Sequence, residues 1–469
     1  MAQPTATAAK IPLTIDLTQT DLPVGTDVYA YIVGLVASDS GNDYYFVNSS
    51  LVPQAMSLSD NTQAANTFPN MDTLDAVAQA ALQPNYPTSW ADYSIPLSVG
   101  DTTVIDLAQF AANMPNLGTG TSAFSGRIYI SVGVPKVPFT PTATPPSTVV
   151  SGYAAPVVGT GGPGALCLFD WIEFSWDSNN NFNGNTTQVD QFGFVLTLDG
   201  TPGGTLQGPM NTSRLDVMAS VEALPSPFTS GLLTVPVPAQ ATSAYPSGID
   251  YLRAMSPKTL TGPATYSGAV ANYFDDTIAS WYRHWSQNPL LINDRATGTY
   301  TGLVGSVALD FYQGTYTLAQ LQSSNPPPIA FTLTGVNPVT GGTTYVISSY
   351  DVWQCTNTLA SGGAAQQNVG KNLAAAFNRG FVSDSLDDTT CASDKDQFYP
   401  AQGVFNPWSQ LFHQVSSNGL AYGFPYDDVC DQNPSIGLSG TTAVTITVGN
   451  FFSSQSAARA SRKADPAFA

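Results

Sequence analysis

The stretch Leu166–Leu198, LCLFDWIEFSWDSNNNFNGNTTQVDQFGFVLTL, decides the expected fold of this chain. Two apolar runs flank a polar, glycine-containing loop at Asp177–Asn185, a pattern typical of two antiparallel strands joined as a hairpin. Side chains alternate between the two faces of a strand, so each acidic residue can be assigned to a face. We therefore expect Glu173 on the first strand and Asp190 on the return strand to meet on one side of a sheet.

These two acids allow two interpretations. Asp and Glu are mostly exposed in proteins, so both could simply lie on a solvated sheet face. The alternative is a pair that hydrolyses a glycosidic bond, with one acid kept protonated and the other ionised to activate water or attack the sugar. Glu173 stands between apolar neighbours and is the candidate for the acid that desolvation keeps protonated. Asp190 follows a polar run and is the candidate for the ionised group.

Composition limits the classes of partner. The chain has 469 residues and a formal net charge of −19, with 40 Gly and 35 Pro. Such an acidic surface repels phosphates and anionic lipids, so we expect neither nucleic acid nor membrane as a partner. No apolar run reaches the roughly 20 residues that span a bilayer. No signal peptide is visible, yet the low Lys content and the many Asn, Ser, Thr and Gly residues are typical of a secreted protein.

Cysteine and histidine spacing argues against a metal site. The four cysteines lie too far apart for a zinc ribbon or a C-x-x-C motif, and the chain has only two histidines. Two disulfides are possible and all three pairings stay open. Shared segments suggest Cys355 with Cys391 and Cys167 with Cys430 as partners.

The pattern along the chain predicts two domains. Short alternating strands separated by turn residues predict a β-domain over 11–204, completed by 401–452 through the strand Thr441–Val448. Residues 205–400 mix strands with helices, while 1–10 and 453–469 read as disordered tails. The Pro- and Gly-rich segment Pro135–Gly164 is either a linker or, as we expect, a long surface loop bordering a binding site. Helices are expected at Met71–Leu82, Arg214–Leu224, Gly268–Trp285, Asn368–Phe381 and Pro407–Ser417.

Three patches together carry a family resemblance. They are WIEFSW…TTQVDQFGFVLTL in the hairpin, AAAFNRG at Ala374–Gly380, and NPWSQLFHQVSSNGLAYGFPYDDV at Asn406–Val429. The combination resembles glycoside hydrolase family 64, the laminaripentaose-producing β-1,3-glucanases, whose barrel domain is related to thaumatin-like proteins. The resemblance implies a mainly β fold with α+β character. A thaumatin-like β-barrel or sandwich domain and a mixed α/β domain would then flank a wide groove.

The resemblance also implies a reaction. The family hydrolyses β-1,3-glucan with inversion, and its general acid falls on Glu173 in the W-x-E-F pattern and its general base on Asp190 in the Q-V-D pattern. Inversion requires carboxyl groups roughly 6.5–9.5 Å apart, a distance that depends on strand register and cannot be read from the sequence. The implied enzyme is a monomeric endo-type hydrolase that releases short laminari-oligosaccharides and needs no metal or organic cofactor.

Sugar-contacting positions are also implied by the resemblance. Three of them differ from the residue that is common in the family: Ser175 stands where Thr is frequent, Asp177 where Asn is, and Phe182 where Trp is. The Tyr422–Asp428 segment is read either as a strand entering an Asx-type turn or as part of the groove floor. The full set of implied substrate-binding residues is Ser175, Asp177, Phe182, Thr187, Tyr422 and Asp428.

Two further polar residues have structural interpretations. We expect His413 to be structural, because nothing near it in sequence supplies a nucleophile, and Arg379 to cap a helix C-terminus rather than pair with a groove carboxylate. Two alternative functions stay open: a thaumatin-like glucan-binding protein that has lost catalysis, and a hydrolase of another neutral polysaccharide.

Overall fold

The expected hairpin forms, but its return strand is shorter than predicted. In the computed structural model, β10 (Leu168–Asp177) pairs antiparallel with β11 (Phe182–Thr186). The return strand therefore begins inside the segment predicted to be loop and ends before Asp190 is reached. The turn forms because the Asp177 carboxylate accepts hydrogen bonds from the backbone N–H groups of Asn179 and Asn181.

Two sheets pack face to face around the hairpin and form the first lobe. The larger has the order β22-β11-β10-β7-β2-β3-β4, with β5 also paired to β2, and the smaller has the order β13-β23-β1-β6. Apolar side chains from both sheets share one core, so the architecture is a sandwich. The sheets do not close into a barrel within the described strands, so the barrel form of the prediction is wrong. The remaining strands are β1 (Pro12–Asp16), β2 (Val28–Ser38), β3 (Gly41–Val47), β4 (Pro53–Ala55), β5 (Ile95–Leu97), β6 (Thr102–Asp106), β7 (Ala123–Val132), β13 (Leu196–Thr201), β22 (Ser435–Leu438) and β23 (Ala443–Val448).

The structure describes only part of the chain. The described residues are 10–38, 41–67, 72, 74–82, 86–118, 122–159, 161–209, 211–236, 244–261, 270–294, 296–305, 308–335, 337–338, 344–382 and 397–453. Most of both predicted tails, and Cys391, lie outside these residues.

Strand β23 shows why the C-terminal segment joins the first lobe. Val444, Ile446 and Val448 are buried and alternate with less buried residues, so one face of the strand enters the core. β23 lies between β1 and β13, parallel to β1 and antiparallel to β13. We propose that 11–204 with 401–452 forms one domain and 205–400 the other.

The Pro- and Gly-rich segment after β7 is a packed loop. It contains a small hairpin of β8 (Thr140–Thr142) and β9 (Gly152–Ala154). Phe139 is fully buried, and the Tyr153 ring packs on Phe139 and Tyr44. The described part of this segment is therefore a surface loop of the first lobe, as predicted, rather than a flexible linker.

The second lobe (described residues between 270 and 382) has its own core. Helices α5 (Asp275–Trp285), α7 (Ser349–Gln354) and α8 (Ala364–Asn378) pack against the sheet β16-β17-β18-β19. Helix α5 begins later than predicted, with Gly268 outside the described residues, and α8 begins earlier, at Ala364. The strands are β16 (Leu290–Asp294), β17 (Gly298–Val304), β18 (Ala308–Gln313) and β19 (Phe331–Thr334).

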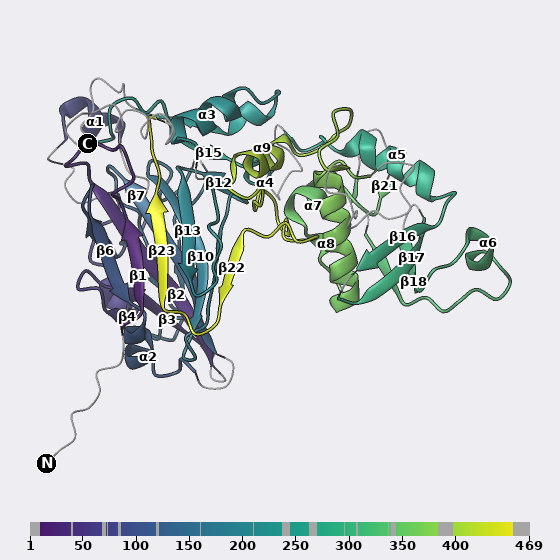
Figure 1. Ribbon diagram of the computed structural model, residues 1–469, viewed down its shortest axis with the longest axis horizontal. Helices are drawn as coiled ribbons and strands as arrows, with labels where there is room; N and C mark the ends of the chain where they lie inside the picture. Colours follow the sequence, from purple (N-terminus) through teal and green to yellow (C-terminus); the bar gives the residue numbers. More distant parts are fainter. Residues whose placement is uncertain are drawn as a thin grey trace, which may run out of the picture.

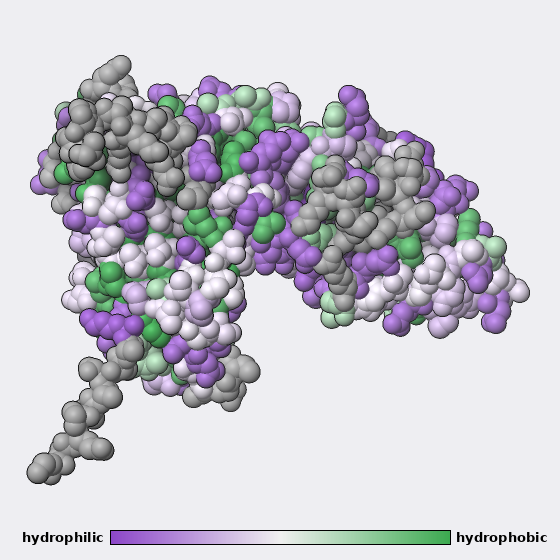
Figure 2. Space-filling model, viewed as in Figure 1, coloured by the Kyte–Doolittle hydropathy of each residue, from purple (hydrophilic) through white to green (hydrophobic). Residues whose placement is uncertain are grey.

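A third group of elements joins the two lobes (Figure 1). Helices α3 (Arg214–Glu222), α4 (Pro257–Leu260) and α9 (Pro407–Val415) lie here with the short sheet β12-β15-β14. The surface is hollowed between the lobes, beneath this connection (Figure 2). The other elements are β12 (Gln191–Phe192), β14 (Leu232–Thr234), β15 (Tyr251–Met255), β20 (Asn337–Pro338), β21 (Thr344–Tyr345), α1 (Ala76–Ala81), α2 (Ala108–Asn113), α6 (Leu318–Leu321) and the 3₁₀ turns η1 (Leu58–Asp60), η3 (Phe228–Gly231) and η4 (Asn357–Leu359).

The cysteines differ from the suggested pairing. Cys167 and Cys355 are free and buried, whereas Cys430 is disulfide-bonded. Both suggested pairs are therefore wrong, because each contains a cysteine that the core holds as a free thiol. Among the described helices, none is long and apolar enough to cross a membrane.

Candidate active site

Glu173 lies at the centre of a row of polar residues that crosses three strands. It faces Arg127 on β7 and Asn185 on β11. Nε and Nη2 of Arg127 lie 3.1 and 2.9 Å from Oε1 of Glu173. The Glu173 side chain is 33% exposed. Ile172 and Phe174 flank Glu173 in sequence but point to the opposite face, into the core, so they do not desolvate its carboxyl group.

An open cavity of about 600 Å³ lies over this row. Residues of β7, β10 and β11 line it together with Tyr153 and Ala155 of the loop after β7, the loop predicted to border a binding site. Strands β10 and β22 lie on the side of the first lobe that faces α7 and α8 across the hollow (Figure 1). Polar side chains that line the cavity include Ser125, Arg127, Glu173, Ser175, Asn183, Asn185 and Ser435.

Asp190 reaches the same region by another route. It lies in the segment between β11 and β12, and its Oδ1 is 2.5 Å from Nζ of Lys258 at the start of α4. Its carbonyl accepts hydrogen bonds from the Ser256 N–H (3.0 Å) and the Thr259 hydroxyl (2.7 Å). The hairpin ladder therefore does not position Asp190, contrary to the prediction. The contacts with residues 256–259 position it instead.

The two carboxylates act on one guanidinium. Burial opposes the charge on Arg127, but its contact with Tyr129 and the charges of Glu173 and Asp190 raise the pKa of Arg127. Burial likewise raises the pKa of Tyr129, and the same two carboxylates raise it further while Arg127 lowers it. The charges of Glu173 and Asp190 thus both act on Arg127 and Tyr129, although the two acids are not hairpin neighbours.

The four predicted sugar contacts in the hairpin separate into different environments. Ser175 lines the cavity. Asp177 holds the β10–β11 turn, and Thr187 is buried with its hydroxyl 3.4 Å from the Val189 N–H. Phe182 is fully buried and stacks on Phe174 in the core, so it cannot stack on a sugar. The prediction for Phe182 is wrong because the observed register turns it inward.

That register also reveals residues that sequence reasoning missed. Asn183 and Asn185 alternate with Phe182 on β11 and line the cavity. Side-chain alternation places both asparagines on the face opposite Phe182 once the strand is known to begin at Phe182. Arg127 lies in the strand GRIYISV, and nothing in the sequence by itself pairs that strand with the one that carries Glu173. The pairing of β7 with β10 makes that connection.

Tyr422 and Asp428 extend the polar surface toward the second lobe. The Tyr422 carbonyl accepts a hydrogen bond from the Gln188 N–H at 2.9 Å. Burial, Asp428 and Glu173 all raise the pKa of the Tyr422 hydroxyl. Desolvation also raises the pKa of Asp428, and Lys371 opposes that effect. Asp428 lines a second cavity of about 210 Å³ with Asn293, Asp294, Asn368, Lys371 and Asn372. Residues 422–423 are not in a strand, and 424–428 form a bend followed by turns, so the strand of the first interpretation is absent there while its turn is present.

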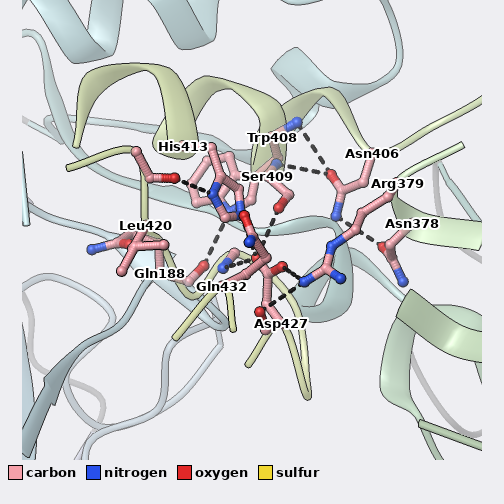
Figure 3. Close-up of polar contacts among 12 residues, drawn as sticks. Gln188, Asn378, Arg379, Asn406, Trp408, Ser409, His413, Leu420, Asp427 and Gln432 are labelled. Atoms are coloured by element: carbon pink, nitrogen blue, oxygen red, sulfur yellow. Dashed lines mark hydrogen bonds and ion pairs between the residues drawn. The ribbon is translucent and has the colours of Figure 1, made fainter. Parts of the chain in front are cut away.

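A buried network supports this segment from behind (Figure 3). The Asp427 carboxylate receives hydrogen bonds from Arg379 Nη2 (2.9 Å), Ser409 Oγ (2.9 Å) and the Gly423 N–H (2.9 Å), and His413 Nε2 lies at 3.1 Å. Burial opposes the charge of Asp427, but His413, Arg379 and the Gly423 N–H outweigh it and lower the pKa of this carboxyl. Arg379 is the C-cap residue of α8, as expected, and its guanidinium in addition pairs with the buried Asp427 carboxylate.

The network is structural rather than a nucleophile site. Ser409 and His413 both contact the same oxygen, Oδ2 of Asp427, whereas a catalytic triad needs a serine–histidine hydrogen bond. The other ring nitrogen of His413 contacts the Gly419 carbonyl at 2.8 Å. The expectation for His413 therefore agrees with its contacts. In the described part of the chain, no group of three or more His, Cys, Asp or Glu residues could hold a metal ion.

Comparison with known proteins identifies the family. The family model Glyco_hydro_64, described as beta-1,3-glucanase, matches residues 12–448, so the chain belongs to this family and is a glycoside hydrolase that cleaves β-1,3-glucan internally. No curated protein sequence matches the chain.

Solved structures share the fold. The β-1,3-glucanase domain (GH64) from Clostridium beijerinckii has a TM-score of 0.66 at 21% identity and covers 95% of this chain and 100% of its own. A laminaripentaose-producing β-1,3-glucanase in complex with laminaritetraose has a TM-score of 0.65 at 19% identity, with the same coverage. The laminaripentaose-producing enzyme from Paenibacillus barengoltzii has a TM-score of 0.55 at 19% identity and covers 95% of this chain and 76% of its own.

Proposed function

We propose that this β-1,3-glucan hydrolase cleaves its substrate in a single displacement with inversion, with Glu173 as general acid and Asp190 as general base. The observation that carries the proposal is geometric: Glu173 lies in an open cavity and is held there by Arg127. Asp190 is held by Lys258, and its charge also acts on Arg127. An inverting glycosidase needs two acids in one site with room for a water molecule between them and the sugar.

Glu173 would deliver its proton from the face of the sheet. Both contacts of Arg127 fall on Oε1, so Oε2 is the oxygen that we assign to the glycosidic oxygen of the substrate. A bound glucan covers the exposed part of Glu173, and desolvation disfavours the charged form of a carboxyl group. Substrate binding thus assists protonation of the acid at the time it is needed.

Asp190 would activate the attacking water. Lys258 contacts its Oδ1, which leaves Oδ2 to accept the proton of a water that attacks the anomeric carbon from the opposite side. The leaving sugar takes its proton from Glu173, and the new reducing end has the inverted anomeric configuration. No metal or organic cofactor enters these steps.

The substrate groove would extend from the first lobe toward the second. Asn185 lines the cavity beside Glu173, and its buried Oδ1 has no hydrogen-bond partner among the described residues, so its amide group is the candidate contact for a sugar hydroxyl. Ser175 offers a hydroxyl on the same surface. Thr187, Tyr422 and Asp428 would continue the groove, with Asp177 acting only through the turn it holds.

Further properties follow the family resemblance. Two solved relatives are described as laminaripentaose-producing, which supports short laminari-oligosaccharides as products. We also propose that the first lobe is thaumatin-like and that the enzyme is secreted and acts as a monomer.

The test is hydrolysis of laminarin by Glu173→Gln and Asp190→Asn. We expect each variant to lose at least about a thousandfold in kcat, a rough figure for removal of a group that transfers a proton in the transition state. NMR of the first product formed by the wild-type enzyme should show the α-anomer. Glu222→Gln on α3 and Asp199→Asn on β13 are the matched controls and should hydrolyse laminarin normally. Wild-type rates in both active-site variants would exclude the assignment.

A further inference from the structure

The segment that carries Asp190 is attached to the strand that carries Glu173. β11 leaves β10 after Thr186, opposite Ile172. The chain returns to β10 at Gln191, whose Nε2 donates to the Phe169 carbonyl at 2.7 Å. Residues 187–190 therefore leave the sheet between two attached ends, and Asp190 stands beside the second attachment.

Asp170 strengthens this second attachment, because it holds the backbone just after Gln191. It lies on β10 three positions before Glu173 and is 3% exposed. Its Oδ2 accepts hydrogen bonds from the backbone N–H groups of Gly193 (2.7 Å) and Phe194 (3.4 Å), and its Oδ1 accepts one from the Trp171 N–H (2.9 Å). One buried carboxylate thus joins the strand of the proposed acid to the chain that follows the proposed base.

Gly193 shows how closely the two segments approach. A Cβ atom at this position would lie 2.3 Å from the Phe169 carbonyl oxygen, so only glycine permits the contact. If Asp170 were apolar, the Gly193 N–H would be buried without an acceptor, which is unfavourable for a backbone donor. The backbone around Gly193 would then have to move away from β10 for its N–H group to find another acceptor.

Two buried arginines hold the other side of the segment. Arg214 Nε donates to the Gly193 carbonyl at 2.6 Å, and Arg253 Nη1 donates to Oε1 of Gln191 at 2.5 Å. Arg253 is fully buried, and Arg214 is 4% exposed. Burial raises the pKa of Asp170 to about 7, although its three amide contacts and the charge of Arg253 oppose this effect. The carboxyl group of Asp170 is therefore costly to ionise, and it lies at the junction between β10 and the segment that follows Asp190.

We propose that Asp170 is a positioning residue for Asp190 and thereby sets the separation of the two carboxyl groups across the sugar linkage. The proposal rests on the proposed roles of Glu173 and Asp190. Inversion tolerates only a limited range of separations, because a water molecule must fit between base and sugar. A displacement of about 1 Å in an active site can cost roughly a hundredfold in rate.

The experiment compares Asp170→Asn and Asp170→Ala with Glu173→Gln and Asp190→Asn. kcat and KM are measured on a laminari-oligosaccharide and on an aryl β-laminarioside with a 2,4-dinitrophenolate leaving group. The activated leaving group departs without a proton, so it restores activity when the acid is missing but not when water activation is impaired. Asp351→Asn is the matched control, since Asp351 is also fully buried, accepts hydrogen bonds from Ser348 and Asn357, and has a pKa raised by burial.

We expect Asp170→Ala to lose about a hundredfold in kcat on both substrates, with KM within about twofold of wild type. Asp170→Asn keeps one carbonyl acceptor for the Gly193 N–H and should lose less, about tenfold. Asp351→Asn should keep wild-type kcat even if it lowers thermal stability. If Asp170→Ala does not fold, Asp170→Asn alone decides.

Three outcomes would overturn the proposal. The first is a kcat within threefold of wild type in Asp170→Asn and, where it folds, Asp170→Ala. The second is recovery of the Asp170 variants on the activated substrate, which would place the defect at Glu173. The third is a changed KM with kcat equal to that of the wild type. The roles proposed for Glu173 and Asp190 are tested by their own variants. Those roles would be wrong if Glu173→Gln and Asp190→Asn kept wild-type activity, whatever the Asp170 variants do.

Discussion

Arg127 binds Glu173 straight across the β7–β10 ladder, with Nε and Nη2 at 3.1 and 2.9 Å from the same oxygen, Oε1. The guanidinium also lies over the Trp171 ring, 5.0 Å from its centre, and this contact restricts its movement. A planar group with two parallel donors fixes a carboxylate more firmly than an ammonium group does. The orientation of Glu173 therefore depends on a residue that the hairpin does not contain.

The first prediction concerns this contact. Arg127→Lys keeps the charge but loses the two-donor geometry, so we expect kcat on laminarin to fall about tenfold while stability changes little. Steady-state kinetics with a thermal melt tests this. Arg283→Lys, on the exposed surface of α5, is the control and should match wild type. An unchanged kcat in Arg127→Lys would show that charge alone holds Glu173.

The second prediction concerns Lys258, whose Nζ contacts Asp190 at 2.5 Å. Lys258→Met removes the positive charge and leaves the Asp190 carboxylate free to rotate. We expect kcat to fall by about one to two orders of magnitude, as misplaced catalytic groups do. Lys136→Met removes a comparable partly buried ion pair, with Asp92 at 2.9 Å, away from the cavity. It should lower stability without lowering kcat. Equal kcat values in the two variants would contradict the prediction.

The third prediction concerns the pH dependence of stability through Asp170. The pKa of Asp170 is raised from 3.8 to about 7 in the folded chain, with burial as the main cause. Between these values the unfolded chain releases the proton that the folded chain keeps, so rising pH favours unfolding. The stabilising contribution is present below about pH 4 and is lost as pH rises to about 7. Urea titrations of wild type and Asp170→Asn should show their difference changing across this window and constant above it.

The fourth prediction concerns Asp427 beneath the Tyr422 segment. Asp427→Asn leaves the buried Arg379 without a charged partner, and breaking such a pair costs about 3–5 kcal/mol of unfolding free energy. The lowered pKa of Asp427 means that its contribution is present above about pH 4 and is lost as pH falls further. Chemical denaturation at several pH values measures both effects. Asp199→Asn, on the exposed face of β13, is the control and should change stability by less than about 0.5 kcal/mol.

The fifth prediction separates packing from sugar binding on β11. Phe182 is fully buried, so Phe182→Ala should cost about 3–5 kcal/mol of stability but leave the KM of the folded enzyme unchanged. Asn185→Ala, three positions later on the cavity side, should raise KM with little loss of stability. If Phe182→Ala fails to fold, Phe182→Leu serves the same comparison. A raised KM in the Phe182 variants would restore that residue to the sugar-binding surface.

Much of the first lobe could be read from local pattern. Strand β23 alternates apolar and Thr residues, and β10 places Glu173 opposite in face to Ile172 and Phe174. These features depend on side-chain alternation, which the sequence states directly. The Pro- and Gly-rich loop after β7 was also recognised, because the strand pattern continues on both sides of it.

By itself, then, the sequence determined which face of its strand Glu173 occupies and, through its family motifs, the pair of acids to examine. Only the tertiary structure decided how Asp190 reaches that face, since β11 ends too early to carry it and contacts with residues 253–259 and with Asp170 take over. Register and long-range contacts also decided that Phe182 is core and that Arg127 binds Glu173. The physical reason is that alternation is a property of one strand, whereas the position of a loop and the pairing of distant strands depend on hydrogen bonds between residues far apart in the chain.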